Sequence, residues 1–269
     1  MGLWTLSHLY TLVPSVIAMV IITGVLYIFL LKDKSLNIRM IPFQILNVFL
    51  LLIEVIKQIL SIIEGYQYHY LPFHFCSLFL VVLPTMAFYR GPYQDVLGCL
   101  SSSLCLSLFL FMSVYPNLLY GPDAISTFFT DYFNFHTVTF HSIPLFALIL
   151  IIGLRLHKPT KKWHFIPILI VMVCFCFIAS VVAYTMEVNF SSFYYCHIPP
   201  IEEARLKLVE KIGFLGKLIY TFTAWVLHIT VVLISYVLYV CIQYAYGKYV
   251  VKDYEIEDKR IGELGVSLA

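Results

Sequence analysis

The sequence predicts an all-α membrane protein, a polytopic bundle of about seven transmembrane helices, and three observations support this prediction. Of the 269 residues, 61% are hydrophobic and only 12% are charged, whereas an ordinary soluble domain has roughly 25% charged residues. The mean hydropathy of the chain is +0.90. A helix needs about 20 residues to cross a bilayer. Apolar runs of about this length recur along the whole chain. The lipid bilayer is therefore the expected solvent.

The apolar runs are separated by short polar connections. They cover approximately residues 11–31, 40–63, 71–89, 96–115, 135–154, 165–186 and 218–244. Glu54 and Lys57 interrupt the second run, and several serines thin the fourth. The chain contains no internal repeat, low-complexity tract or linker. We therefore expect a single integral membrane domain over residues 1–269, with a short cytoplasmic tail at 247–269.

The positive charges alternate along the connections. Lys and Arg occur in the first, third and fifth connections and in the tail, whereas residues 1–10, 64–70 and 116–134 contain none. The positive-inside rule therefore predicts an amino terminus outside and a carboxyl terminus in the cytoplasm. The connection at 187–217 breaks the alternation, because it carries both charge signs and apolar residues near helical spacing. We expect a short interfacial helix there, outside the membrane.

The overall charge and the cysteines exclude several classes of protein. The net charge is only +2, with 17 basic and 15 acidic residues, so neither a nucleic acid nor a strongly acidic partner is expected. The seven cysteines are odd in number and lie mostly in apolar runs, where a free thiol behaves as a small hydrophobic group. The sequence therefore predicts no disulfide framework, and it gives no indication of protein partners.

Ionisable side chains inside the predicted spans are candidates for function, because they are costly in hydrocarbon. Counted from the outer ends of their helices at about 1.5 Å per residue, Cys76 and His141 both lie about 8 Å below the outer boundary. By the same count, Glu54 and His228 lie at about 14 Å. We therefore expect Cys76 and His141 to meet in an outer-leaflet cavity, with Glu54 and His228 forming its floor.

A cysteine beside a histidine is suited to nucleophilic catalysis. The thiolate is the reactive species, and apolar surroundings disfavour it, so a base must take the proton. His141 is the expected base. The alternatives are that Cys76 is only a packing residue and that His141 hydrogen-bonds to a neighbouring helix. His74 is two positions from Cys76 and does not share its face of a regular helix, so we expect His74 to shape the cavity mouth.

Other polar residues have simpler explanations. Glu54 and Lys57 have the i, i+3 spacing of a pair within the bundle. We place His136 in or near an external loop, and His157 and His164 beside the lipid headgroups that flank a basic cytoplasmic loop. No metal is expected, because His74, Cys76 and His141 lack the short repeated spacing of a zinc site.

Four segments carry a resemblance to a known family. They are Leu-Pro-Phe-His-Phe-Cys-Ser at 71–77, Tyr-Pro-Asn at 115–117, Phe-His at 140–141, and Asn189 with the aromatic residues that follow it up to the prolines at 199–200. Through these segments the chain resembles the YwaF family of bacterial integral membrane proteins, and the resemblance covers most of the range from the second to the seventh predicted helix. That family is related to the eukaryotic transmembrane protein 164 acyltransferases.

The resemblance implies a membrane-embedded acyltransferase, located in the bacterial cell membrane, that moves acyl chains between a phospholipid and a lysophospholipid. It implies Cys76 as the nucleophile and His141 as the base, and it implies no cofactor. His74 and Asn189 are candidates for stabilising the oxyanion. The rival hypothesis is a non-enzymatic seven-helix transporter or ligand sensor, in which Glu54, Lys57, His141 and His228 line a polar path.

Overall fold

The computed structural model describes residues 6–114, 119–120, 124–159 and 164–250, and within these residues the regular structure is entirely helical. The Tyr-Pro-Asn segment at 115–117 and the tail from residue 251 lie outside them. The longer helices are α1 (Leu6–Val25), α3 (Ile41–Ile63), α4 (Phe79–Phe88), α5 (Gln94–Val114), α6 (Tyr132–Gly153), α7 (Phe165–Met186), α8 (Pro199–Ile212) and α9 (Phe214–Val250). Helix α1 continues through a π-helical segment, Leu26–Leu31, and the short α2 (Leu36–Arg39) leads into α3.

Six helices are long and apolar enough to cross a membrane, and they correspond to six of the seven predicted spans. The chain is thus an integral, multi-pass membrane protein. The span predicted at 71–89 differs, because its helix covers only the 14 residues Phe75–Phe88. This helix is about 21 Å long, against about 30 Å of hydrocarbon. The physical reason is Pro72, since a proline favours an extended backbone in the residue before it, and both Leu71 and His74 are extended.

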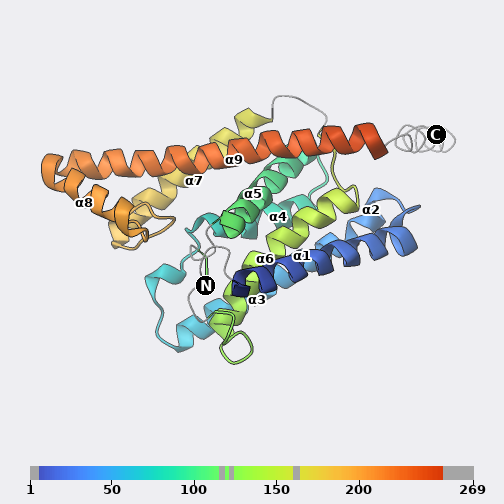
Figure 1. The fold of residues 1–269 in the computed structure, drawn as a ribbon, viewed down its shortest axis with the longest axis horizontal. Coiled ribbons are helices and arrows are strands. Elements are labelled where there is room, and N and C mark those ends of the chain that lie inside the picture. The colour runs from blue at the N-terminus through green and yellow to red at the C-terminus, as the bar shows by residue number, and fades with distance from the viewer. Residues whose placement is uncertain (1–5, 115–118, 121–123, 160–163, 251–269) are drawn as a thin grey trace.

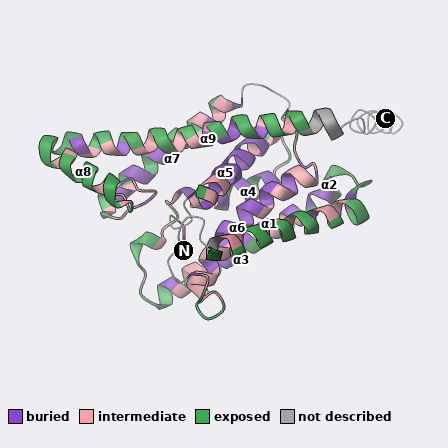
Figure 2. Cartoon of the chain, viewed as in Figure 1, coloured by how far each residue is buried: buried purple, intermediate pink, exposed green. Residues whose placement is uncertain are grey.

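Helices α5 and α6 form the centre of the bundle, as the burial colours in Figure 2 show. In the most apolar stretch of α5, 67% of the residues are buried, compared with 11% in α1. Helix α5 packs against α4, α6 and α9, while α1 and α3 pack against α6. The serines that thin the fourth predicted span are all buried on α5, and Ser107 donates a hydrogen bond to Ser235 of α9 at 2.9 Å. Small polar residues of this kind are typical where membrane helices approach closely.

A helical hairpin extends from one end of the bundle (Figure 1). It consists of α8, which confirms that the connection at 187–217 contains a helix, and the beginning of the 37-residue α9, which then continues along the bundle. Gly213 joins them with a φ of +58°, a backbone conformation that glycine adopts without steric cost. Helix α1 begins and α9 ends at opposite ends of the bundle.

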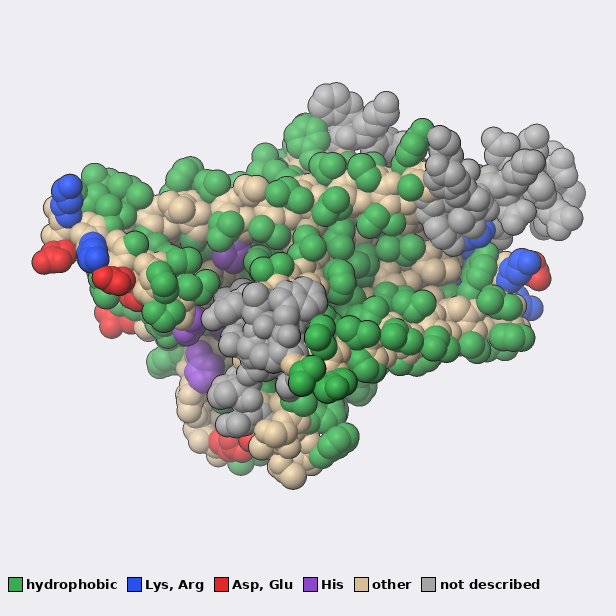
Figure 3. Space-filling view, viewed as in Figure 1, with side chains coloured by type: hydrophobic (Ala, Val, Ile, Leu, Met, Phe, Trp, Pro, Cys, Tyr) green, Lys and Arg blue, Asp and Glu red, His purple; other side chains and the backbone are tan. Residues whose placement is uncertain are grey.

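Hydrophobic side chains cover most of the face shown in Figure 3, and the charged side chains on that face gather toward its extremities. The outward-facing apolar residues belong mainly to α1, α3, α7 and α9. A soluble protein rarely exposes a continuous apolar surface of this extent, so these faces are the ones that contact lipid.

Candidate functional site

Cys76 lies in the first turn of the short helix Phe75–Phe88, as its second residue. The sequence placed it about five residues inside a longer helix, and the extended segment that follows Pro72 explains the difference. The turn is a 3₁₀ turn in which the Ser77 N–H donates to the His74 carbonyl at 2.9 Å. No side chain caps it. Because the first N–H groups of a helix lack acceptors within that helix, this turn favours negative charge beside Cys76.

His141 of α6 has one nitrogen engaged and one unpartnered. Its Nδ1–H donates to the Thr137 carbonyl of the same helix at 2.7 Å, and a carbonyl can only accept, so the proton is on Nδ1. The Nε2 atom is buried and has no hydrogen-bond partner among the described residues. The hydrogen bond to a neighbouring helix that we considered for His141 is therefore absent there. The Nε2 lone pair is therefore free to accept a proton.

Cys76 and His141 share a charged neighbour, Lys57 of α3. The Lys57 ammonium is close enough to act electrostatically on both the Cys76 thiol and the His141 imidazole. His74, two residues before Cys76, also acts on His141. No hydrogen bond joins the thiol to the imidazole in the part of the chain that the structure describes. The described residues therefore show no contact between Cys76 and His141, and their partnership stays a prediction.

Glu54 is the centre of a buried polar network rather than the floor of a cavity shared with His228. Its carboxylate bonds Lys57 Nζ at 3.0 Å and Gln58 Nε2 at 2.7 Å, both on α3. The i, i+3 pairing with Lys57 that we considered is thus present. The other carboxylate oxygen accepts from His136 Nε2 of α6 at 2.9 Å. His136 lies in the second turn of α6, near the preceding loop, but its side chain is buried and paired with this carboxylate, which the sequence did not predict.

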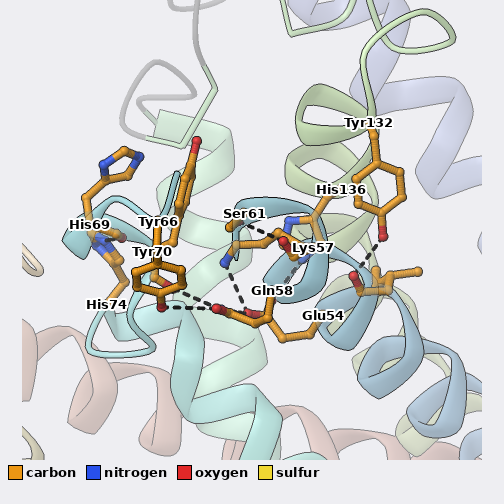
Figure 4. Close-up of polar contacts among 11 residues, drawn as sticks. Glu54, Lys57, Gln58, Ser61, Tyr66, His69, Tyr70, His74, Tyr132 and His136 are labelled. Carbon is orange, nitrogen blue, oxygen red and sulfur yellow. Dashed lines mark hydrogen bonds and ion pairs between the residues drawn. The ribbon is translucent and has the colours of Figure 1, made fainter. Parts of the chain in front are cut away.

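The network continues into the segment that precedes Cys76, and Figure 4 shows its members together. Gln58 Nε2 also donates to the Tyr70 carbonyl at 3.0 Å, and the Tyr66 hydroxyl donates to Gln58 Oε1 at 3.0 Å. On the other side, the Tyr132 hydroxyl of α6 donates to the Ile53 carbonyl at 2.8 Å. Charged groups inside a membrane protein are normally paired in this way, and this pairing fixes α3, α6 and the 66–70 segment relative to one another.

His228 of α9 lies close to Cys76 in another direction. Its ring packs against Phe75, with ring centroids 5.8 Å apart, and against Phe193 at 5.3 Å. Its Nδ1–H donates to the Ala224 carbonyl of its own helix at 2.8 Å. Glu54 takes its partners from α3 and α6 instead, so the structure does not show Glu54 and His228 forming one cavity floor. Two residues at the same depth meet only if their side chains also face each other, and the partners of Glu54 and His228 show that these two do not.

His74 and Asn189 shape the covering of the segment before Cys76. His74 Nε2–H donates to the His69 carbonyl at 3.1 Å, and its ring lies against Phe190, with centroids 5.3 Å apart. Asn189 Oδ1 accepts hydrogen bonds from the backbone N–H groups of Tyr194 and Tyr195 at 3.3 and 3.2 Å. Asn189 therefore holds the aromatic loop folded, and Phe190 of that loop is fully buried.

A small cleft of about 60 Å³ lies beside His141, between α1, α5 and α6. Its lining includes Tyr120, which packs edge-on against the His141 ring with centroids 5.9 Å apart, and Ser142. The volume is enough for a few water molecules.

The sequence did not predict a second polar cluster, which lies at the amino-terminal end of α5. Asp95 accepts hydrogen bonds from His157 and His164, each at 2.7 Å. We had placed both histidines beside lipid headgroups, but their side chains are buried against protein. No sequence signal could have found this cluster, because the histidines lie 62 and 69 residues from the aspartate.

Comparison with curated protein sequences and with solved structures gives no match. The sequence model of the TMEM164 family matches residues 3–208. The matched region covers α1 to α7 and most of α8, including every candidate residue except His228. We had expected the resemblance to extend into the seventh predicted span, but it ends before α9. The match covers more than half of the chain, and the chain therefore belongs to the TMEM164 family.

Proposed function

We propose that this protein is a membrane-embedded acyltransferase that moves acyl chains between a phospholipid and a lysophospholipid, with Cys76 as the nucleophile and His141 as the base. The observation that carries the proposal is the position of Cys76 in the uncapped first turn of a short helix. The buried His141, with its unpartnered Nε2, supports it. Membership of the TMEM164 family agrees with a multi-pass protein whose natural ligands are lipids.

The reaction follows from the two side chains. His141 Nε2 accepts the proton of the Cys76 thiol, and the thiolate attacks the ester carbonyl of the donor phospholipid. The ester C–O bond breaks, and the departing lysophospholipid oxygen takes the proton back from the imidazolium, which leaves an acyl thioester on Cys76. A lysophospholipid hydroxyl then loses its proton to His141 and attacks the thioester. The Cys76 thiolate leaves and recovers that proton.

The tetrahedral intermediates carry a negative oxygen that hydrocarbon cannot stabilise. The N–H groups at the start of the helix Phe75–Phe88 that have no acceptor within the helix are the candidate donors to this oxygen, and one such donor typically contributes about 3–4 kcal/mol in an acyl-transfer site. The Lys57 ammonium adds a positive field at longer range. Its charge is partly compensated by Glu54, so its field at Cys76 is reduced.

The proposal includes an orientation and a location. With the amino terminus outside and the carboxyl terminus in the cytoplasm, as the positive charges favour, Cys76 and the Glu54 network belong to the outer half of the bundle. Asp95, His157 and His164 then belong to its cytoplasmic end. The resemblance to bacterial proteins supports the bacterial cell membrane as the location.

The test is acyl transfer in proteoliposomes that contain purified protein, a donor phospholipid and a labelled lysophospholipid. Wild type is expected to place the label in diacyl lipid, and Cys76→Ala and His141→Gln are each expected to lose at least about 100-fold of this rate. Cys241→Ala, which changes an exposed cysteine on α9, is the matched control and should equal wild type. If Cys76→Ala transfers label as fast as Cys241→Ala, the cysteine mechanism is wrong, and if wild type transfers none, the transporter or sensor hypothesis takes its place.

A further inference from the structure

The second polar cluster contains the ligand types of a transition-metal site. Asp95 and Cys99 are one turn apart on α5 and therefore share a face of that helix, and His157 follows the end of α6. One ligand atom from each of these three residues lies within 4.8 Å of the other two. We propose that Asp95, Cys99 and His157 bind a divalent transition-metal ion of the zinc type, at the end of the bundle opposite Cys76.

The side chains of the cluster are largely buried, which favours a specific metal site over a chance grouping of side chains at the surface. Cys99 is fully buried, and the His157 side chain is only 6% exposed. The His157 ring lies directly against the backbone of α5 at Gly98, where an added Cβ would be 2.2 Å from its Cδ2 atom. Only glycine at this position allows the imidazole to approach α5 so closely. The backbone of α5 therefore limits where the His157 ring can lie.

The hydrogen bonds around the three ligands resemble the outer contacts of known metal sites. His157 uses Nε2 for Asp95, and its Nδ1 bonds the Tyr239 hydroxyl of α9 at 2.8 Å. Histidines that bind metals almost always have such a partner on the second ring nitrogen. The second Asp95 oxygen accepts from His164 Nε2 at 2.7 Å, which holds the carboxylate toward His157. Each outer contact comes from a different element of the bundle.

The donor set decides which cation fits. Carboxylate oxygen, imidazole nitrogen and thiolate sulfur together are typical of Zn²⁺, whereas Mg²⁺ and Ca²⁺ are bound almost wholly by oxygen. A tetrahedral ion with bonds of about 2.0–2.3 Å needs ligand atoms about 3.4 Å apart. The Asp95–His157 contact at 2.7 Å would therefore open by less than about 1 Å. The fourth position is filled by water.

The protons balance in a simple way. Without the cation, the neutral His157 ring donates its Nε2 proton to Asp95; when the cation binds Nε2, that proton moves to Nδ1, which then donates to the Tyr239 oxygen. The Cys99 thiol loses one proton to solvent, and Asp95 binds as the carboxylate. We expected no metal from the sequence, and this proposal departs from that expectation.

The experiment uses the full-length protein, purified in detergent with a tag that contains no histidine or cysteine. The protein is stripped with a chelator, loaded with Zn²⁺ or Co²⁺ and desalted. We expect about one zinc ion per chain, and in the cobalt form the sulfur-to-metal charge-transfer absorption of a thiolate ligand. Zinc should also raise the thermal unfolding midpoint of wild type, which is a readout that needs no variant.

Matched cysteine variants locate the ion. Cys99→Ser should abolish the charge-transfer absorption, whereas Cys105→Ser, at another fully buried cysteine of α5, should retain it. Tyr239→Phe should retain the absorption and weaken zinc binding by about 10-fold. The proposal is overturned if wild type binds no stoichiometric zinc, or if the absorption survives in Cys99→Ser. Either result would show that Asp95 and the histidines form a hydrogen-bonded cluster without metal.

Discussion

The buried network around Glu54 allows a sharp prediction about stability. Glu54→Leu removes the acceptor of three side chains, and it leaves the Lys57 ammonium, which is only 15% exposed, without its carboxylate. Removing one partner of a buried pair costs about 3–5 kcal/mol, because the remaining charge is uncompensated. Both side chains keep some exposure, so we take about 3 kcal/mol. At about 2–4 °C per kcal/mol, the unfolding midpoint should fall by about 6–12 °C.

The double variant distinguishes this reasoning from a loss of packing. Glu54→Leu with Lys57→Leu removes both charges, and replacing a buried pair by apolar residues is often neutral. The double variant should therefore be more stable than Glu54→Leu alone, in thermal unfolding of the protein in lipid nanodiscs. Glu64→Leu, at an exposed position just beyond α3, is the control and should shift stability by less than about 0.5 kcal/mol. A double variant no more stable than the single would refute the argument.

Three further predictions concern other parts of the bundle. Gly98→Ala places a Cβ against the imidazole of His157 and should lower stability in thermal unfolding by about 1–3 kcal/mol. Gly24→Ala, where nothing lies within 4 Å of the added Cβ, is the control and should not destabilise the protein. His228→Gln should retain acyl transfer in the lysophospholipid assay, and a loss equal to that of His141→Gln would make His228 the base. In α8, the hydrogen bond from Arg205 holds the pKa of Glu202 below its ordinary value. The stabilisation of α8 by this pair should therefore be full at neutral pH and decline as the pH falls through that lowered pKa. Proteolysis of α8 should show this decline in wild type and not in Glu202→Gln.

The sequence was sufficient to predict most of the fold, because hydropathy and run length decide which segments enter a bilayer. Six long helices lie where the apolar runs lie. The exception, at 71–89, came from counting apolar residues without giving weight to Pro72. The shorter helix matters for function, since it places Cys76 at a helix start instead of inside a helix.

The arrangement of the polar residues was harder to predict. Counting along helices gives the depth of a side chain, but it does not give the direction in which that side chain points. Glu54 and His228 were expected at equal depth, yet Glu54 pairs with His136 and His228 packs against Phe75. Such pairs join residues that are 82 or more positions apart, and no local pattern in a single sequence marks them.

The most direct test of the proposed function is to look for the acyl group on Cys76 itself. Purified protein is incubated with a phospholipid that carries a labelled acyl chain, without any acceptor, and its peptides are analysed by mass spectrometry. The account predicts a labelled thioester on the peptide that contains Cys76, which is released by neutral hydroxylamine and by added lysophospholipid. Acyl transfer that proceeds with no label on Cys76, at any time before acceptor is added, would contradict it.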